Sequence, residues 1–162
     1  MWAPWRSTYV GRESAGEYEK PQGCPFCRLP ASGDDRAALI VHRGEHAFVI
    51  MNLYPYNNGH LMVVPFAHLD DLRSLGPPVL AEMTDLIGRA EDALDDAIGP
   101  EGFNIGINQG RAAGAGIADH LHAHVVPRWI GDTNFMPAVN DTRVIPQHLL
   151  ETYDLLCERF RT

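Results

Sequence analysis

The sequence has few positive charges, no long hydrophobic run and only three cysteines. Thirteen Lys and Arg stand against twenty-one Asp and Glu, a formal net charge of −8, so the chain as a whole repels nucleic acids and anionic membranes. No stretch reaches the roughly 18 apolar residues that span a bilayer, and residues 1–6 lack the apolar segment of a signal peptide. We therefore expect a cytoplasmic protein, with neither nucleic acid nor membrane as partner.

The length and composition are those of one globular domain. The chain has 162 residues, of which 45% are hydrophobic and 21% charged, which excludes a disordered or fibrous chain and predicts a single domain over residues 1–162. The odd number of cysteines and the expected reducing compartment argue against a disulfide scaffold. Two of the three form Cys24-Pro-Phe-Cys27, a spacing typical of a metal half-site or of a redox pair.

Hydrophobic periodicity predicts an α+β fold, with an antiparallel sheet of about five strands, a long helix packed on it and a C-terminal helix. Pro77 and Pro78 suit the first turn of the long helix, and Gly99 ends its apolar pattern. The expected elements are an irregular N-terminal arm over 1–30, strands at 39–41, 47–53, 61–64, 103–108 and 120–126, and helices over 77–98 and 146–162.

Three alternating histidines are the strongest chemical signal. In His120-Leu-His-Ala-His124 the period of two places all three imidazoles on one face, if the segment is a strand. A surface strand that carries histidines for solubility is the plain alternative, but it does not account for the strict alternation beside a glycine-rich loop. Three uses remain open: a metal site, a general acid and base cluster, or a histidine nucleophile.

The loop before the histidines favours phosphoryl chemistry. Residues 108–116, Asn-Gln-Gly-Arg-Ala-Ala-Gly-Ala-Gly, have little side-chain bulk and present backbone N–H groups that suit the close approach of a phosphate. A neutral imidazole attacks phosphorus readily at pH 7, because its ordinary pKa is about 6.5. We therefore expect a reaction at phosphorus for which the chain needs no metal.

The segment from His120 to Trp129, His-Leu-His-Ala-His-Val-Val-Pro-Arg-Trp, resembles the signature of the histidine triad (HIT) superfamily of nucleotide hydrolases and transferases. The likeness extends to residues 52–65, 102–108 and 131–136, and residues 2–6 resemble the bacterial branch similar to diadenosine tetraphosphate phosphorylases. The resemblance implies a HIT-like fold, a homodimer and a nucleotide substrate.

The resemblance also implies roles for particular residues. His122 matches the nucleophile that attacks the α-phosphorus and becomes a covalent nucleotidyl-histidine. His124 would contact the phosphate or the leaving-group oxygen, Asn108 would bind near the phosphate, Asn52 would contact the ribose, and His60 follows the turn glycine as in the family. Further nucleotide or phosphate contacts are expected at Gln109, Gly114, Ala115, Gly116 and Trp129.

One departure from the family bears on the reaction. Hydrolases of the fragile histidine triad type carry Gln four residues before the first triad histidine, where this chain has Gly116. The missing side chain leaves room for inorganic phosphate as acceptor, so the sequence predicts an enzyme that cleaves diadenosine tetraphosphate by phosphorolysis to ATP and ADP. The alternatives are a hydrolase of dinucleoside polyphosphates or nucleoside phosphoramidates that releases AMP, and a nucleotide-binding regulatory protein with vestigial catalysis.

The cysteine pair completes a metal site if the resemblance holds. Relatives close such a site with a CxxC pair, a later histidine and the first triad histidine, which correspond to Cys24, Cys27, His68 and His120 in this chain. We therefore expect a structural tetrahedral Zn²⁺ and no organic cofactor. A redox-active zinc sensor, built on the two cysteines alone, is the remaining alternative.

Overall fold

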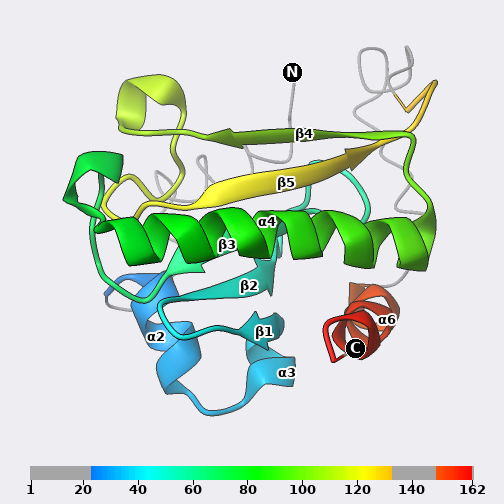
Figure 1. Ribbon diagram of the computed structural model, residues 1–162, viewed down its shortest axis with the longest axis horizontal. Helices are drawn as coiled ribbons and strands as arrows, with labels where there is room; N and C mark the ends of the chain where they lie inside the picture. The colour runs from blue at the N-terminus through cyan, green and yellow to red at the C-terminus, as the bar shows by residue number, and fades with distance from the viewer. Residues whose placement is uncertain (1–22, 133–148, 162) are drawn as a thin grey trace, which may run out of the picture.

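A computed structural model describes residues 23–132 and 149–161 of the chain. Five strands form one antiparallel sheet in the order β1-β2-β3-β5-β4 (Figure 1), which confirms the predicted α+β class. The strands are β1 (Ile40–Arg43), β2 (Ala47–Met51), β3 (Leu61–Pro65), β4 (Gly102–Ile107) and β5 (Ala123–Arg128). The helices are α2 (Pro25–Ala31), α3 (Asp35–Ala38), α4 (Pro77–Ile98) and α6 (Leu149–Arg159), with 3-10 turns η1 (Leu72–Ser74) and η2 (Arg111–Ala113).

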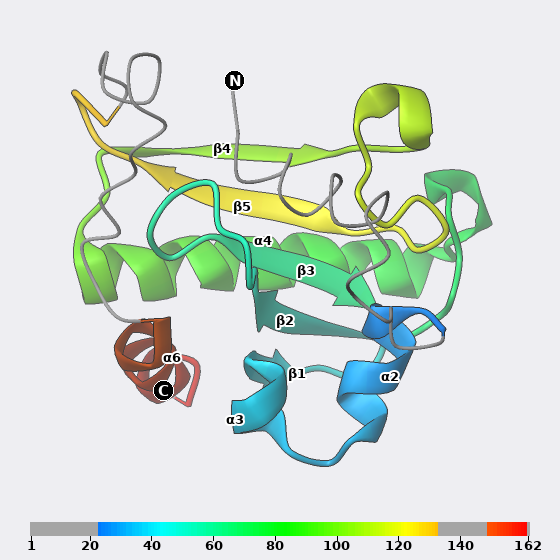
Figure 2. The same ribbon diagram turned by 180° about the vertical axis from the view of Figure 1, so that it is seen from behind.

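Helix α4 lies across one face of the sheet, as Figures 1 and 2 show from opposite sides. It begins at Pro77 and ends at Ile98, and the C-cap that follows is Gly99, whose left-handed backbone (φ +52°) few other residues adopt easily. Its buried side is apolar and packs on the alternating side chains of β2, β3 and β5, which together form the larger of two hydrophobic clusters. Both ends of this helix confirm the sequence prediction.

The opposite face of the sheet carries a smaller apolar cluster beneath α2 and α3. Figure 2 looks onto this face, with α4 behind the sheet. The cluster consists of Phe26, Ala38, Ile40, Phe48, Ile50, Met62 and Val64. Among the described residues, α2 and α3 lie over one corner of this face.

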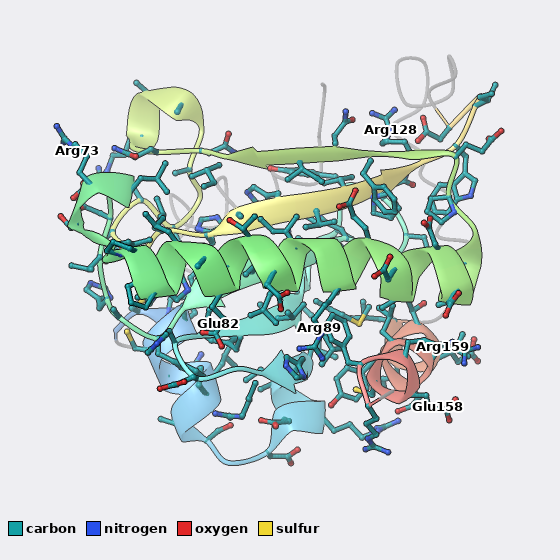
Figure 3. The ribbon with its side chains drawn as sticks, in the orientation of Figure 1. Arg73, Glu82, Arg89, Arg128, Glu158 and Arg159 are labelled. Atoms are coloured by element: carbon teal, nitrogen blue, oxygen red, sulfur yellow. The ribbon has the colours of Figure 1, made fainter. Side chains whose placement is uncertain are left out.

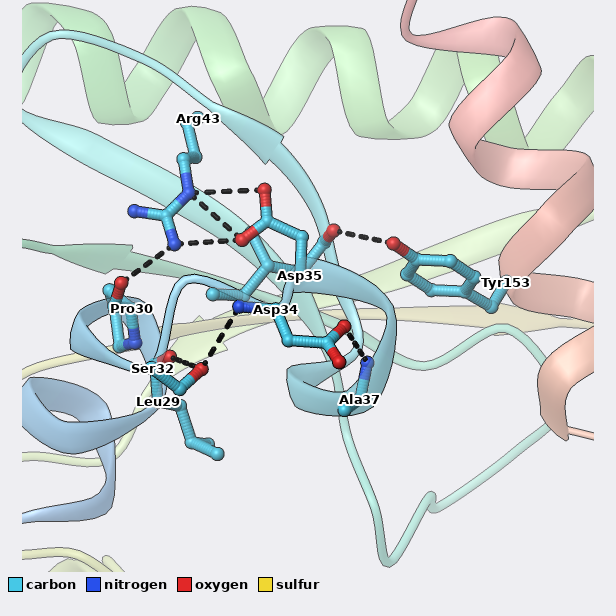
Figure 4. Close-up of polar contacts among 9 residues, drawn as sticks. Leu29, Pro30, Ser32, Asp34, Asp35, Ala37, Arg43 and Tyr153 are labelled. Atoms are coloured by element: carbon cyan, nitrogen blue, oxygen red, sulfur yellow. Dashed lines mark hydrogen bonds and ion pairs between the residues drawn. The ribbon is translucent and has the colours of Figure 1, made fainter.

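Polar contacts hold that corner together (Figure 4). Asp34 caps α3 by accepting the Ala37 N–H at 3.0 Å. Arg43 of β1 donates to the Asp35 carboxylate at 2.7 Å and to the Pro30 carbonyl at 2.8 Å, which attaches α2 and α3 to the sheet. The Tyr153 hydroxyl donates to the carbonyl of Ile40 at 3.1 Å and so docks α6 on the same strand.

Glu82 of α4 makes hydrogen bonds within the fold. Figure 3 shows Glu82 on the side of α4 that faces the β1–β2 turn. Its carboxylate accepts the backbone N–H groups of Glu45 at 2.7 Å and His46 at 2.5 Å, which lowers the pKa of Glu82 against the opposing effect of burial. A Cβ at Gly44 would lie within 3.0 Å of this carboxylate, so a larger residue there would have to displace the Glu82 side chain.

Some of the predicted boundaries differ in the structure, and one cannot be compared. The N-terminal arm is not irregular to residue 30, because α2 begins at Pro25, directly after the Cys24 N-cap; residues 1–22 lie outside the described part. β5 begins at Ala123 and not at His120. The C-terminal helix is described from Leu149, and the expected start at 146 lies outside the described residues.

No helix of the described residues has the length and apolarity that a membrane span requires.

Candidate active site and metal-binding cluster

The three alternating histidines do share one face, although the strand starts later than predicted. Leu121, Ala123 and Val125 belong to the apolar cluster beneath α4. The histidines between them therefore face the opposite side of the sheet, where His120 and His122 contact Phe26. The period of two thus continues ahead of β5, into residues that are not in the strand ladder.

The His122 ring is held in one tautomer. The side chain is 4% exposed, and its Nδ1 lies 2.9 Å from the carbonyl oxygen of His120. Because a carbonyl can only accept, Nδ1 carries the proton and Nε2 carries the lone pair. Burial lowers the pKa of His122, and the bond to the carbonyl opposes that effect only in part. A neutral imidazole with a lone pair on Nε2 is the state that a histidine nucleophile needs.

A second hydrogen-bonded chain orients His124. The Tyr56 backbone N–H donates to Nδ1 of His60 at 3.1 Å, and the Asn52 amide nitrogen lies 3.3 Å from the same atom. His60 must therefore carry its proton on Nε2, which lies 3.0 Å from Nδ1 of His124. His124 accepts this bond, so its own proton is on Nε2 when the ring is neutral. The His122 and His124 rings meet edge on, with centroids 4.8 Å apart. The His122 ring, whose Nε2 can accept, therefore lies beside the His124 ring, whose Nε2–H can donate.

The turn before β3 fixes the position of His60. Gly59 has φ +72°, and a Cβ there would lie 2.6 Å from the Ile98 Cδ1 atom and 2.8 Å from the Leu94 Cδ2 atom of α4. Pairing of Met62 with His124 then places β3 beside β5. The Tyr56 ring stacks on His60 at 4.8 Å. His60 is thereby 1% exposed and directly adjacent to the triad.

The predicted phosphate loop begins at the same end of the sheet. Ile107, the last residue of β4, pairs with Ala123, the first residue of β5. Asn108 and Gln109, which follow β4, therefore leave the sheet at the same end as His122, which precedes β5. Within the loop, the N–H groups of Ala113, Gly114 and Ala115 bond to carbonyls of the η2 turn. Gly116 is exposed beyond that turn. The contacts of the loop with a phosphate stay predictions.

Trp129 is not brought to the triad. Gly102 pairs with Arg128 at the far end of β5, roughly 20 Å along the strand from His122. The Trp129 indole N–H donates to the Gly99 carbonyl at 3.1 Å, which holds the side chain at the turn between α4 and β4. Any contact of Trp129 with a nucleotide would have to occur away from the triad of the same chain.

Two cysteines and two histidines form a cluster that could hold a metal ion. One ligand atom from each of Cys24, Cys27, His68 and His120 lies within 4.8 Å of all the others. The Sγ atom of Cys24 is 3.2 Å from Nδ1 of His120, and that of Cys27 is 3.3 Å from Nδ1 of His68. In a tetrahedral site with bonds of about 2.0 to 2.3 Å, ligand atoms lie about 3.3 to 3.8 Å apart.

The orientation of His120 fits this use. Its Nε2 lies 2.9 Å from the Pro65 carbonyl and is therefore the protonated nitrogen. The Nδ1 lone pair is directed at the cysteines, and the carbonyl partner fixes the ring as outer contacts of metal-bound histidines commonly do. The residues therefore fit a tetrahedral metal ion both in donor type and in spacing.

Two aromatic residues at the site were not among the predicted site residues. Phe26 contacts the rings of both His120 and His122, and Tyr56 stacks on His60. Tyr56 stands in a turn, where aromatic residues more often simply pack. The only signal for Phe26 in the sequence is its position between two closely spaced cysteines. That position places it next to any metal site that the two cysteines form.

Comparison with known proteins agrees with this geometry. Residues 35–129 match the family model of the HIT domain. The chain is 40% identical over 161 residues to a Mycobacterium tuberculosis protein named AP-4-A phosphorylase, covering 96% of this chain and 81% of that protein. It is similar in structure to a Zn-bound histidine triad family protein from Mycobacterium smegmatis, with TM-score 0.69 and 26% identity over 86% of this chain and 94% of the other. The fold, the three histidines and these similarities show that the chain belongs to the HIT family.

Proposed function

We propose that this protein is a nucleotidyltransferase that cleaves diadenosine tetraphosphate by phosphorolysis, through a covalent adenylyl-His122. The observation that carries the proposal is the hydrogen bond from His122 Nδ1 to the His120 carbonyl, which leaves the lone pair on Nε2. The 40% identity to a protein named AP-4-A phosphorylase supports the choice of substrate and reaction.

The first step forms the intermediate. Nε2 of His122 attacks the α-phosphorus of one adenosine, and the bond from that phosphorus to its bridging oxygen breaks. ATP leaves with the electron pair of the broken bond on that oxygen, and the Nε2–H of His124 donates a hydrogen bond that stabilises the developing negative charge. The pairing of His60 with His124 supports this role, because it keeps Nδ1 of His124 occupied as an acceptor and directs the proton to the other nitrogen.

The second step releases the adenylyl group. An oxygen of inorganic phosphate attacks the phosphorus of adenylyl-His122, the P–N bond breaks, and ADP leaves with the neutral imidazole restored. We assign contacts with the transferred phosphate to Asn108, to Gln109 and to loop residues Gly114, Ala115 and Gly116, and contacts with the ribose to Asn52. Room at Gly116 for the acceptor phosphate favours phosphorolysis over hydrolysis.

We propose that the metal cluster of Cys24, Cys27, His68 and His120 holds a structural Zn²⁺. Four protein ligands close a tetrahedral site, so the ion would supply stability and leave the reaction to the histidines. The thiol ligands stay available in a reducing cytoplasm, which is the compartment that we propose. The Zn-bound relative from Mycobacterium smegmatis supports zinc as the ion.

Product analysis tests the reaction. Purified protein is incubated with diadenosine tetraphosphate, with and without inorganic phosphate, and ATP, ADP and AMP are separated by chromatography. ADP that appears only with phosphate is the expected result. AMP in both incubations would instead identify a hydrolase and contradict the argument from Gly116.

A histidine variant tests the intermediate. His122→Gly is expected to lose turnover by several orders of magnitude while it keeps nucleotide affinity, because the nucleophile makes its bond only during the reaction. His46→Ala, which changes a histidine outside the site, is the control and should keep full turnover. Unchanged turnover of His122→Gly would exclude His122 as the nucleophile.

A further inference from the structure

Phe26 joins the metal-binding cluster to the proposed nucleophile. It stands between Cys24 and Cys27 on α2, ahead of the residues that form the sheet. Its side chain is 3% exposed and belongs to the smaller apolar cluster. The turn that carries two of the four metal-ligand candidates thus inserts one aromatic ring into the face on which the histidines lie.

The ring contacts two of the three triad histidines. Phe26 meets the His120 ring edge on, with centroids 5.4 Å apart and an interplanar angle of 74°. It meets the His122 ring at 5.0 Å and 53°. His124 contacts the same His122 ring at 4.8 Å and 77°. The His122 imidazole therefore has an aromatic contact with Phe26 in addition to that with His124.

The aromatic contacts restrict the orientation of the His122 ring, which the hydrogen bond alone does not fix. The bond from Nδ1 to the His120 carbonyl fixes one atom of the His122 ring, but a single bond leaves the ring able to swing about its Cβ. Aromatic contacts at these separations favour a defined ring orientation. Attack on phosphorus requires Nε2 to be aligned with the bond that breaks, and a displacement of about 1 Å can reduce a rate by about a hundredfold.

We propose that Phe26 is a positioning residue that fixes the orientation of the His122 ring and thereby couples the metal-binding turn to the reaction. The proposal rests on the proposed role of His122 as nucleophile. It predicts that loss of the Phe26 ring reduces turnover even when the metal cluster remains loaded and the nucleotide still binds.

Kinetics of three variants test this. Phe26→Ala is expected to lower kcat by about 10- to 100-fold with KM changed by less than about threefold, and Phe26→Leu, which fills much of the space, by about 3- to 10-fold. Phe48→Leu is the matched control, because Phe48 is fully buried in the same apolar cluster and its ring contact is with Phe66. It should lower the Tm and leave kcat unchanged. Zinc per chain is measured in each variant by elemental analysis.

Two results would overturn the proposal. One is a kcat within about twofold of wild type in a folded Phe26 variant, and Phe26→Leu decides this if Phe26→Ala does not fold. The other is an equal loss of kcat in Phe48→Leu, which would mean that general packing and not ring contact is responsible.

A measurement without substrate separates this proposal from the proposed function. Diethyl pyrocarbonate acylates imidazole nitrogens, and mass spectrometry locates the modified histidine. In Phe26→Ala the His122 ring should react several-fold faster than in wild type, with His46 unchanged. Equal rates at His122 would contradict the positioning role. If the wild type shows no turnover of diadenosine tetraphosphate but the labelling rates differ, the proposed function fails and the positioning of His122 stands.

Discussion

Gly59 shows how much of the site depends on a single residue without a side chain. Its backbone is left-handed, at φ +72°, and the side-chain tips of Leu94 and Ile98 occupy the place where a Cβ would be. The next residue, His60, is the one that pairs with His124. The glycine therefore sets both the approach of the turn to α4 and the start of the hydrogen-bonded chain.

Replacement of this glycine is expected to destabilise the fold. Gly59→Ala should lower the free energy of unfolding by about 2 to 4 kcal/mol, because the left-handed backbone and the overpacked contact each cost about 1 to 2 kcal/mol. Urea unfolding measures the change. Gly88→Ala is the control: Gly88 lies inside α4, and a Cβ added there would meet no heavy atom within 4 Å, so this variant should gain about 0.5 to 1 kcal/mol. Equal stability of Gly59→Ala and wild type would contradict the steric argument.

For single residues, the sequence predicts the side of the sheet on which a side chain lies better than it predicts the hydrogen-bond partner of that side chain. The alternation of histidines with Leu121 and Ala123 is sufficient to place all three imidazoles on one side. The pairing of His60 with His124 requires contact between residues 64 positions apart, and no local pattern encodes it. The tautomers of His60 and His124 follow from that contact and from the Tyr56 backbone N–H, so only the structure reveals them.

Among the elements, α6 is attached to the sheet through a small titratable cluster. Arg89 of α4 lies on the side toward α6 (Figure 3) and donates to Nε2 of His42 at 3.2 Å and to the Phe160 carbonyl at 3.3 Å. The His42 and Phe160 rings stack at 5.2 Å. Because Arg89 can only donate, His42 takes part in this cluster as a neutral acceptor.

The stability of this attachment should depend on pH. Burial first, and Arg89 second, lower the pKa of His42 below its ordinary value, while Glu82 and Asp85 act in the opposite direction. The native state therefore binds fewer protons than the unfolded state. The contribution of neutral His42 is complete above about pH 6.5 and is lost as the pH falls through the lowered pKa. His42→Gln keeps an acceptor that does not titrate, so it should lose less stability than wild type between pH 7 and pH 5 in urea unfolding. Identical losses would exclude His42 as a source of the pH dependence.

Helices and strands with clear end signals and a long apolar period could be predicted from the sequence, and those without them could not. α4 could be predicted to its ends because Pro77 and Gly99 mark both termini and the apolar period between them is long. α2 could not, because it is short, contains Pro30 and buries only Phe26. The late start of β5 has a different cause: His120 and His122 bond to carbonyls by their rings, and the ladder with β3 and β4 begins only at Ala123.

For the whole molecule, the metal-ligand candidates connect three distant segments. Cys24 and Cys27 belong to α2 and its N-cap, His68 follows β3, and His120 precedes β5; Cys24 and His120 are 96 residues apart in the chain. From the residues alone, only the Cys24-Pro-Phe-Cys27 half of this set could be predicted. The two histidines joined this set through family resemblance: nothing in the local sequence marks His68 as a ligand, and the alternation at His120 left a metal site as one of three possible uses.

We therefore expect removal of the proposed Zn²⁺ to weaken the whole fold. Treatment with a strong chelator is expected to lower the Tm by roughly 10 °C, because a ligand far above its Kd adds about 4 kcal/mol to native-state stability. Added Zn²⁺ should restore the Tm, and Cys24→Ser should bind less zinc and show a smaller response to chelator. Calorimetry together with elemental analysis provides the test. A Cys24→Ser protein with unchanged zinc content and unchanged Tm would contradict the site.

The oligomeric state is the second prediction at this scale. β4 is an edge strand of the described sheet, and Ile105 on it is 46% exposed. We expect a homodimer, and sedimentation velocity at micromolar concentration should show a single species of twice the 18.0 kDa chain mass. A monomer at that concentration would exclude the dimer.

The order of strands in the sheet has a consequence for the synthesis of the protein. β3 and β5 are neighbours in the sheet, but α4 and β4 lie between them in the chain. On the ribosome, a growing chain that has emerged only as far as α4 contains His60 and His68 but lacks His120 and His124, which they contact in the folded protein. Pairing between segments that are distant in the chain is also intrinsically slow. Enzyme activity should therefore appear only after the sheet is complete, which makes activity a direct measure of folding yield.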